Sequence, residues 1–471
     1  MKDEKGFPRI KLPAKATMWY LAISLVGKGV GFICTPVLTR LLSGEEYGKF
    51  SFYITLVGGI SVVCSAISSG SAIYKGLRDY GGQGSSFLRG VLIVNSTFSL
   101  LICLLLFTFH SVLNINPVIF LPITLQILCD GIIATALTSA KFYYKYKDVA
   151  IICLSSSVLP PIISILFLKS VGGGYLARVY PLLFVSIALA IYSLSVLIKS
   201  DRGVDKQTLS YVIRKSAPLL PHSLSSALSG QADKFILCSL MGTAALGKYT
   251  VVFSLGVALQ FIITSLGSAV NPWILRKLDS GGREIIPRLL MPMFLGLCAL
   301  SLCVVAVSPE ALLILAPKDY FDAFPALLPL ALSCPFYFIS TVITVGLIYS
   351  GKGKFSVILS SVSAVLCIIL NYTLIGGFGY LGAGLSALLC RVIEAIVGIY
   401  LLEKSKCGAY VSIKSIALIS LATWTVGVAI YMAKDLLLVR MILLIIPASL
   451  LIYCLAVAKH LVFERDTKIT P

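Results

Sequence analysis

The sequence predicts an all-α polytopic membrane protein with fourteen transmembrane helices. We expect two six-helix repeats, forming N- and C-bundles around a central cavity, and two extra C-terminal helices. Three observations lead to this prediction. Of the 471 residues, 58% are hydrophobic and only 13% are charged, whereas soluble proteins carry about 25% charged residues. Apolar stretches long enough to cross a bilayer recur along the whole chain. The first half of the chain also resembles the second.

The apolar segments have the length that a membrane-spanning helix requires, about twenty residues. A polar, basic segment precedes the first one, and no cleavage site of small residues is recognisable, so we expect an uncleaved first span. The predicted spans are residues 17–38, 51–72, 90–110, 116–138, 149–168, 176–198, 217–240, 249–270, 287–308, 324–349, 355–375, 380–402, 413–432 and 440–458.

The net charge of +19 is a signal of topology and not of nucleic-acid binding. Most of the 39 lysines and arginines lie in alternate loops, those that face the cytoplasm when the N-terminus is inside. This bias indicates an even number of spans with both termini cytoplasmic, and no nucleic-acid partner.

Short sequence matches indicate an internal duplication. The matched segments are 47–50 with 246–249, 154–156 with 359–361, and 174–176 with 379–381. We therefore expect six-helix bundles at 1–205 and 206–405, followed by a two-helix hairpin and cytoplasmic tail at 406–471. Because six is even, both bundles enter the membrane with the same orientation, and a cavity between two such bundles is typical of a transporter.

Six ionisable side chains interrupt these apolar spans, and each costs roughly 2.5–3.5 kcal/mol at the centre of a membrane helix. They must face a polar cavity or pair with one another. The duplication does not repeat them, since Lys28 aligns with Ala227 and Asp233 with Cys34, which favours a functional role. The six residues are Lys28, Asp130, Asp233, Lys234, Arg391 and Glu394.

Lys28 and Asp233 belong to polar faces, because polar or small residues recur around each at helical spacing. Lipid cannot satisfy such a face, which must turn toward protein or water. Hydrogen bonds between helices would explain the serines alone, but the charge on each face favours the lining of a cavity. The faces are Ser24, Lys28, Gly31 and Thr35, and His222, Ser226, Ser229 and Asp233.

Spacing also predicts which charges can pair. Asp233 and Lys234 are adjacent and point about 100° apart on a helix, so we expect them to neutralise each other poorly, with Lys28 as a candidate partner of Asp233. Arg391 and Glu394 are three residues apart and can pair on one face.

Besides Lys28, three charged residues lie in or near the first six spans. Asp130 is either a proton site or a hydrogen-bonded acid. Arg40 and Arg178 lie near the outer ends of their spans, where snorkelling toward lipid headgroups is the default expectation.

Glycine-rich segments at 172–174 and 376–379 lack the pattern of a phosphate-binding loop, and we interpret them as tight turns between spans. The sequence shows no catalytic motif, metal-ligand spacing or nucleotide site. We expect no enzyme activity, no cofactor and no metal site. The coupling ion of a transporter would be H⁺ or Na⁺.

Three segments resemble signatures of bacterial polysaccharide exporters, at matching places in the chain. They are Thr39–Gly48, Asp233-Lys234-Phe235 with Ala245–Tyr249, and Asn271-Pro272-Trp273 with Arg276. With fourteen spans, the chain resembles the multidrug/oligosaccharidyl-lipid/polysaccharide (MOP) superfamily, and within it the polysaccharide transporters and Wzx-type O-antigen flippases.

This resemblance implies a function. Such proteins move an undecaprenyl-pyrophosphate-linked oligosaccharide, the repeat unit of O-antigen or a related surface polysaccharide, from the cytoplasmic to the periplasmic leaflet of the bacterial inner membrane. The resemblance implies ion-coupled alternating access, membrane lipid as a partner, and a polysaccharide polymerase and chain-length regulator as further partners.

Physical chemistry is consistent with that substrate, because a pyrophosphate and sugars cannot cross hydrocarbon without a cationic, hydrated cavity. The residues expected to bind substrate are Lys28, Lys234, Arg40, Arg178, Gln231 and Arg391. The candidates for ion coupling are Asp233, Glu394 and Asp130. A multidrug cation antiporter of the same superfamily and a lipid II flippase stay open as alternatives.

Overall fold

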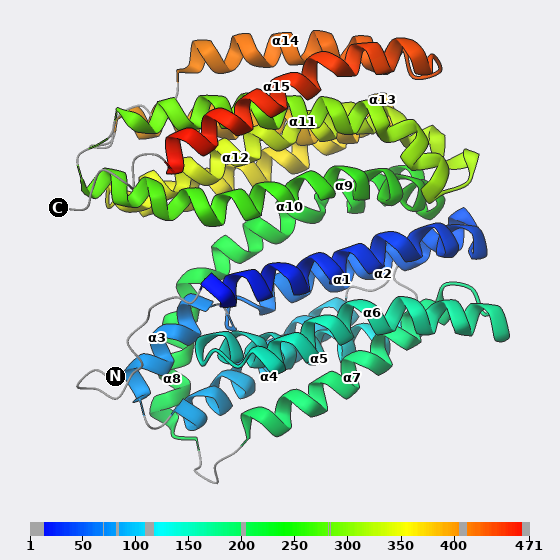
Figure 1. Ribbon diagram of the computed structural model, residues 1–471. Coiled ribbons are helices and arrows are strands. Elements are labelled where there is room, and N and C mark those ends of the chain that lie inside the picture. The colour runs from blue at the N-terminus through cyan, green and yellow to red at the C-terminus, as the bar shows by residue number, and fades with distance from the viewer. Residues whose placement is uncertain are drawn as a thin grey trace. The chain divides into compact units, whose positions relative to one another are not determined.

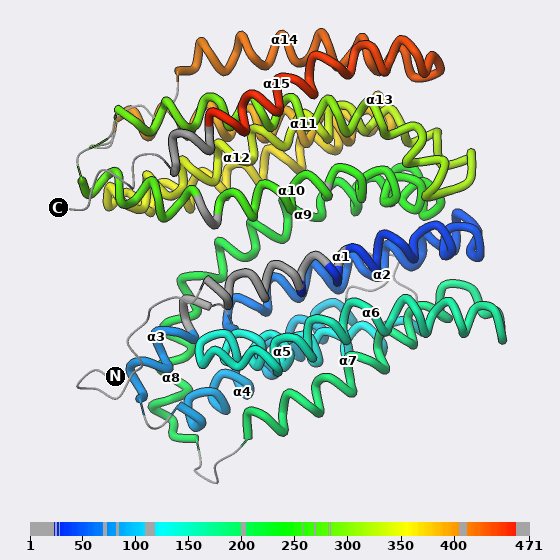
Figure 2. Tube along the Cα trace, viewed as in Figure 1, coloured from blue at the N-terminus to red at the C-terminus, as the bar shows by residue number. Residues whose placement is uncertain are grey.

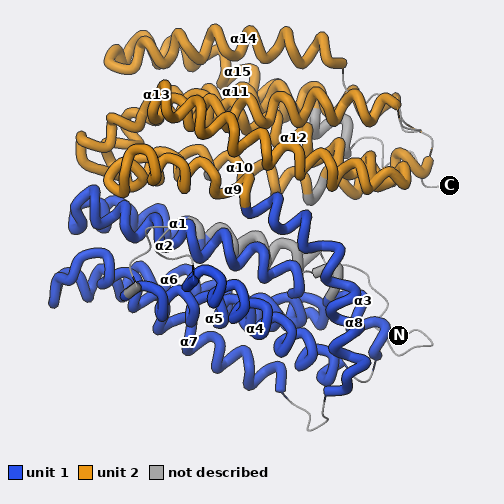
Figure 3. Tube along the Cα trace, turned by 180° about the vertical axis from the view of Figure 1, so that it is seen from behind, with its two compact units in different colours: residues 1–227 blue, residues 228–471 orange. Residues whose placement is uncertain are grey.

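The computed structural model describes residues 14–68, 70–81, 84–108, 117–198, 204–280, 282, 284–404 and 412–463 (Figures 1 and 2). The side chains of some residues inside helices, mostly near the two ends of the chain and including Lys28, lie outside the description. Over the described ranges the chain is helical, without strands. It divides into two compact units, residues 1–227 and 228–471 (Figure 3).

Unit 1 is a bundle built around α5. This helix packs against its neighbours α4, α6 and α7 and against α2, while α1 packs along α6. The helices of this unit are α1 (Ala14–Leu41), α2 (Gly44–Cys64), α3 (Gly70–Tyr80), α4 (Gly84–Thr108), α5 (Phe120–Phe142), α6 (Tyr146–Ser170), α7 (Leu176–Leu197), α8 (Lys206–Ser216) and the first residues of α9 (Leu220–Met241) (Figure 1).

The second span begins and ends earlier than the prediction of 51–72. Ser43 caps α2, because its hydroxyl accepts a hydrogen bond from the Glu46 amide at 3.2 Å, and a cap of this kind fixes where a helix begins. The helix ends at Cys64, and residues 65–68 form turns before α3. Hydropathy alone did not detect this polar first turn.

Unit 2 is organised around α12 (Leu327–Tyr349), which follows the 3-10 helix η4 (Lys318–Ala326). In an 18-residue apolar window of this segment, 89% of the residues are buried. Phe336 of α12 packs against Phe294 with ring centroids 5.6 Å apart. The other helices of the unit are α10 (Thr243–Asp279), α11 (Ile285–Leu315), α13 (Gly353–Glu403), α14 (Ile413–Met432) and α15 (Leu437–Phe463).

The long helix α13 contains two predicted spans, 355–375 and 380–402, separated by a sharp kink. Gly379 has φ 57° and ψ −129°, which is not helical, and positive φ values favour glycine. A Cβ atom on Gly382 would lie 2.0 Å from the Leu374 carbonyl oxygen. The predicted turn at 376–379 is therefore reduced to one residue, since the three before it stay helical, whereas Gly172, Gly173 and Gly174 form the other turn with positive φ throughout.

The last two helices pack on the rest of unit 2. Both α14 and α15 lie against α11, and α14 also touches α12. Arg440 of α15 is 1% exposed and forms an ion pair with Glu310 of α11. This pair ties the start of α15 to α11, because breaking it would leave a buried charge without compensation.

Eleven described helices are long and apolar enough to cross a membrane. Most of the predicted spans coincide with helices of the described chain, with α13 supplying two of them, whereas the predicted span 51–72 continues past the end of α2 at Cys64. The all-α membrane fold class is thus confirmed. The two-repeat arrangement stays a prediction.

The compact units divide the chain after Ala227, within α9, and not at the predicted repeat boundary of 205 and 206. The physical reason is the packing of α8, which follows that boundary yet lies against α3 and α4 of unit 1. Tyr211 of α8 donates a hydrogen bond to Asp79 of α3.

The kink of α13 generates a prediction. Gly382→Ala should lower the free energy of unfolding by about 1–3 kcal/mol, because its methyl group meets backbone atoms that cannot move away. Thermal unfolding of the purified protein in detergent measures the change. Gly376→Ala is the matched control, since nothing lies within 4 Å of a Cβ there. Equal melting temperatures for both variants would contradict the close approach.

Candidate functional site

A polar cavity of about 180 Å³ lies inside unit 2, among α9, α10, α12 and both halves of α13. Its wall contains both apolar and polar side chains, and they lie on helices whose other residues suit hydrocarbon. Polar groups at this depth need partners or water. The polar residues central to the site are Asp233, Gln260, Ser333, Tyr337, Asn371 and Arg391.

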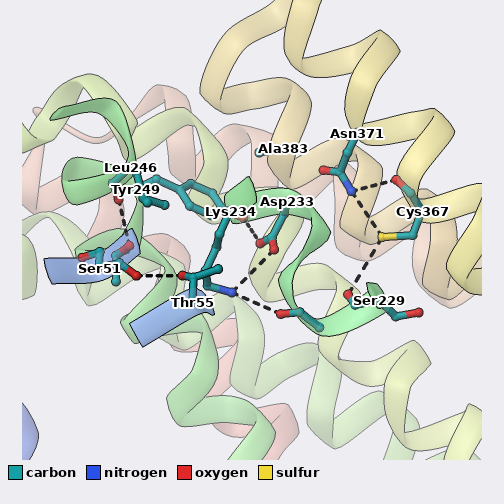
Figure 4. A network of polar contacts seen from close by, with 12 residues as sticks. Ser51, Thr55, Ser229, Asp233, Lys234, Leu246, Tyr249, Cys367, Asn371 and Ala383 are labelled. Atoms are coloured by element: carbon teal, nitrogen blue, oxygen red, sulfur yellow. Dashed lines mark hydrogen bonds and ion pairs between the residues drawn. The ribbon is translucent and has the colours of Figure 1, made fainter. Parts of the chain in front are cut away.

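Asp233 lies on α9 and is held from two sides (Figure 4). The Tyr249 hydroxyl of α10 donates a hydrogen bond of 2.7 Å to Oδ2 of Asp233. Lys234 Nζ lies 3.5 Å from Oδ1. The two adjacent charges thus approach each other without a hydrogen bond to Oδ1 in the described structure, and the expectation of poor neutralisation stays a prediction. The long, flexible lysine side chain bends back to its neighbour, which the angle between helix positions does not capture.

Lys234 has other partners as well. Its ammonium group lies 3.3 Å from the Gly230 carbonyl oxygen and 3.9 Å from the centre of the Phe253 ring. An ammonium over an aromatic face gains a cation–π interaction. Lys234 is 8% exposed and is not among the residues that line the cavity. The ammonium is therefore buried beside the cavity.

Arg391 carries the positive charge in the cavity wall. Its Nη1 donates a 2.8 Å hydrogen bond to Glu394 Oε2, and its guanidinium lies 4.8 Å from the centre of the Tyr337 ring. The pairing predicted from the three-residue spacing is confirmed. Glu394 does not itself line the cavity, but it accepts a hydrogen bond from Arg391, which does.

Asn371 is a buried member of the wall that sequence reasoning missed. Its Nδ2 donates to the Cys367 carbonyl oxygen at 2.8 Å (Figure 4). Its Oδ1 accepts a 2.5 Å hydrogen bond from Ser386. The hydrogen bond from Ser386 connects the two halves of α13 across the kink. An asparagine in an apolar span is itself a signal, because its amide needs partners there.

Only part of the predicted polar face of the seventh span lines the cavity. Ser229 and Asp233 line the cavity, whereas His222 and Ser226 are exposed. Gln231 is half-buried and does not belong to the cavity wall. The side chain of Lys28 lies outside the described residues, so its predicted partnership with Asp233 stays a prediction.

Three candidates belong to unit 1. Arg178 of α7 stacks on two rings of α2, 3.8 Å from the centre of Phe50 and 5.0 Å from that of Tyr47. Arg40 is exposed, and its Nη1 donates to the Pro36 carbonyl oxygen at 2.9 Å. Asp130 accepts hydrogen bonds from Gln126 and Ser61. Arg178 therefore contacts protein, where snorkelling had been the default expectation.

Comparison with known families gives two matches. The profile of the family described as polysaccharide biosynthesis protein matches residues 14–277. The profile described as MatE matches residues 218–373.

Among curated proteins, the chain is 22% identical over 271 residues to the Lsg locus putative protein 1 of Haemophilus influenzae. This match covers 56% of the chain and 66% of that relative, slightly less than two thirds of its length.

Two solved structures share the fold. One is a lipid II flippase MurJ in an inward closed conformation, with a TM-score of 0.68, 15% identity and coverage of 96% of this chain and 100% of that one. The other is an inward-facing multidrug resistance MATE family transporter of the MOP superfamily, with a TM-score of 0.58, 13% identity and coverage of 82% and 94%.

The pair in the cavity wall generates a prediction. Arg391→Gln should destabilise the protein by about 3 kcal/mol, because it leaves the Glu394 carboxylate without its cation. The double variant Arg391→Gln with Glu394→Gln should recover most of that loss, since no charge remains unpaired. Melting temperatures of the wild type, the single variants Arg391→Gln and Glu394→Gln, and the double variant in one detergent measure the coupling. Additive losses in the double variant would mean that the two side chains do not act as a pair.

Proposed function

This chain belongs to the polysaccharide biosynthesis protein family, and on that premise we propose that it is a flippase for a lipid-linked glycan. The substrate would be an undecaprenyl-pyrophosphate-linked oligosaccharide, the repeat unit of O-antigen or a related surface polysaccharide. The protein would move it from the cytoplasmic to the periplasmic leaflet by ion-coupled alternating access. Its location would be the bacterial inner membrane, with both termini in the cytoplasm.

The family match over residues 14–277 carries this proposal. A membrane protein that takes part in polysaccharide biosynthesis faces one physical problem, the passage of sugars and a diphosphate across hydrocarbon. Sugars and a diphosphate cannot enter hydrocarbon, because polar and charged groups lose their hydration there. A polyprenyl tail can stay in lipid throughout. Only the glycan headgroup then needs a polar path through the protein. A polymerase and a chain-length regulator would use the translocated glycan on the periplasmic side.

The cavity of unit 2 supports a polar path, although it is small. Its volume of about 180 Å³ is below the roughly 300–1,000 Å³ of pockets that hold drug-sized ligands. It suits water, a small ion or a single phosphate group. An oligosaccharide would need a larger space, which alternating access would open during the cycle.

The charges divide into two proposed roles. The cationic groups would attract the diphosphate or acidic sugars, with Lys234 as a compact donor and Arg391 as a bidentate one. The candidates for binding the coupling ion are the acids Asp233, Glu394 and Asp130. Together with Arg391, the substrate-binding candidates are Lys28, Lys234, Arg40, Arg178 and Gln231.

Two other functions have some support. A multidrug cation antiporter is favoured by the MatE match at residues 218–373, but the guanidinium in the cavity wall would repel a cationic drug. A lipid II flippase would share the requirement for a diphosphate path. Deletion strains separate the three proposals, because drug sensitivity, loss of viability and loss of a dispensable surface glycan are different phenotypes.

Deletion of the gene should leave cells viable, without surface polysaccharide, and with undecaprenyl-linked repeat units accumulated in the inner membrane. Mass spectrometry of the extracted lipid-linked intermediates identifies the glycan. A lectin or antibody that reaches only the periplasmic leaflet should detect none of them. Normal surface glycan in the deletion strain would exclude the proposed function.

Point variants test the charged residues. We expect Lys28→Ala and Asp233→Ala each to abolish surface glycan, because each removes a charge from the proposed path, while membrane levels of the protein stay unchanged. Lys354→Ala is the matched control, since Lys354 is exposed and lies outside the cavity. Gel analysis of the glycan beside an immunoblot of the membranes measures both quantities. Normal glycan in both charge variants would remove these residues from the path.

A further inference from the structure

Asp130 differs from the other acids inside the spans, because no cation accompanies it. Asp233 lies 3.5 Å from Lys234, and Glu394 lies 2.8 Å from Arg391. None of the ion pairs formed between described residues includes Asp130. A carboxylate away from water without a counter-charge is costly.

The partners of Asp130 are neutral and come from two helices of unit 1. Gln126 Nε2, one turn earlier on α5, donates to Asp130 Oδ1 at 2.9 Å. The Ser61 hydroxyl of α2 donates to Oδ2 at 3.0 Å. The Gln126 amide also donates a hydrogen bond of 2.8 Å to Ser186 Oγ of α7. The carboxyl is therefore fixed where α2, α5 and α7 meet.

The surroundings of this cluster hold no basic group that acts on it. The titratable groups that interact electrostatically with Asp130 are the Tyr53 hydroxyl of α2 and the Cys129 thiol of α5. From α4, Asn95 packs against the backbone of Gly131, and its Oδ1 is buried without a hydrogen-bond partner in the described structure. Among the described residues of α2, α3, α4, α6 and α7, no lysine or arginine contributes to the interactions of the Asp130 carboxyl.

These partners suit both protonation states of a carboxyl group. A serine hydroxyl can rotate, and a glutamine amide can turn over, so each can donate to a carboxylate or accept from a carboxylic acid. Lysine and arginine can only donate, and they hold a neighbouring acid in its charged form. Gln126 Oε1 is buried and without a partner in the described structure, and it is the acceptor that a protonated Asp130 would need.

We propose that Asp130, held by Gln126 and Ser61, is the proton-binding site that couples glycan translocation to the proton gradient. This inference rests on the proposed function. In each cycle one proton forms an O–H bond on the carboxylate from one side of the membrane and leaves it toward the other. Bare Na⁺ fits less well, because both carboxylate oxygens already accept hydrogen bonds, whereas a sodium ion needs several free oxygens.

Infrared difference spectroscopy tests the site without any substrate. The purified protein in lipid is cycled between acidic and alkaline buffer, and the carbonyl band of protonated carboxylic acids is recorded. We expect a band that disappears at alkaline pH in the wild type, is absent in Asp130→Asn, and persists in Asp319→Asn, an exposed control. Asp130→Glu should restore a band at a shifted frequency, which shows that the fold survives substitution.

Two results would overturn the assignment. One is a titrating band that is unchanged in Asp130→Asn. The other is a band whose titration moves when Na⁺ replaces K⁺ at constant ionic strength, which would indicate a cation site.

Surface glycan in cells tests the coupling role. Asp130→Asn should reduce the glycan to the level of the deletion strain, and Asp130→Glu should restore it. Normal glycan in Asp130→Asn would overturn the coupling role and leave the flippase intact. Normal glycan in the deletion strain would reject the proposed function, while the infrared result would still decide whether Asp130 binds a proton.

Discussion

In hydrocarbon no water is available to pair with a polar group, and the rest of this structure depends on that constraint. It requires the backbone to be helical within the membrane, and the described chain is built of helices. The same requirement applies to side chains. Arg440, buried to 1% exposure, pairs with Glu310 and so determines where α15 lies on α11. The charges are therefore packing constraints as well as candidates for function.

The nature of each partner separates the acids chemically. Asp233 and Glu394 have cations beside them, and a neighbouring cation favours the ionised carboxylate. Asp130 has only an amide and a hydroxyl, which tolerate gain and loss of a proton. Unit 2 thus carries ion-paired carboxyl groups at or beside its cavity, and unit 1 carries a carboxyl whose hydrogen-bond partners are neutral, which is the basis of the proposal that it binds the coupling proton.

The cavity of unit 2 depends on the kink in α13. Only glycine readily adopts the backbone angles of Gly379, and the close approach of Gly382 to Leu374 excludes a side chain there. The kink lets two halves of one helix form separate parts of the cavity wall. Asn371 and Ser386 join these halves by a hydrogen bond. A backbone feature and a polar contact therefore shape the wall that Asp233 and Arg391 complete.

The sequence by itself determined the features that depend on local order along the chain. Hydropathy predicts the number and succession of spans, because bilayer thickness sets their length, and spacing predicts the pair of Arg391 and Glu394. Only the tertiary structure decided which helices meet. The stacking of Arg178 on Phe50 and the hydrogen bond from Ser61 to Asp130 join residues that are distant in sequence. The contact of Asn371 with Ser386 joins residues that a kink brings together. Periodicity assigns a residue to a face of its own helix, but the packing of other helices decides what that face touches.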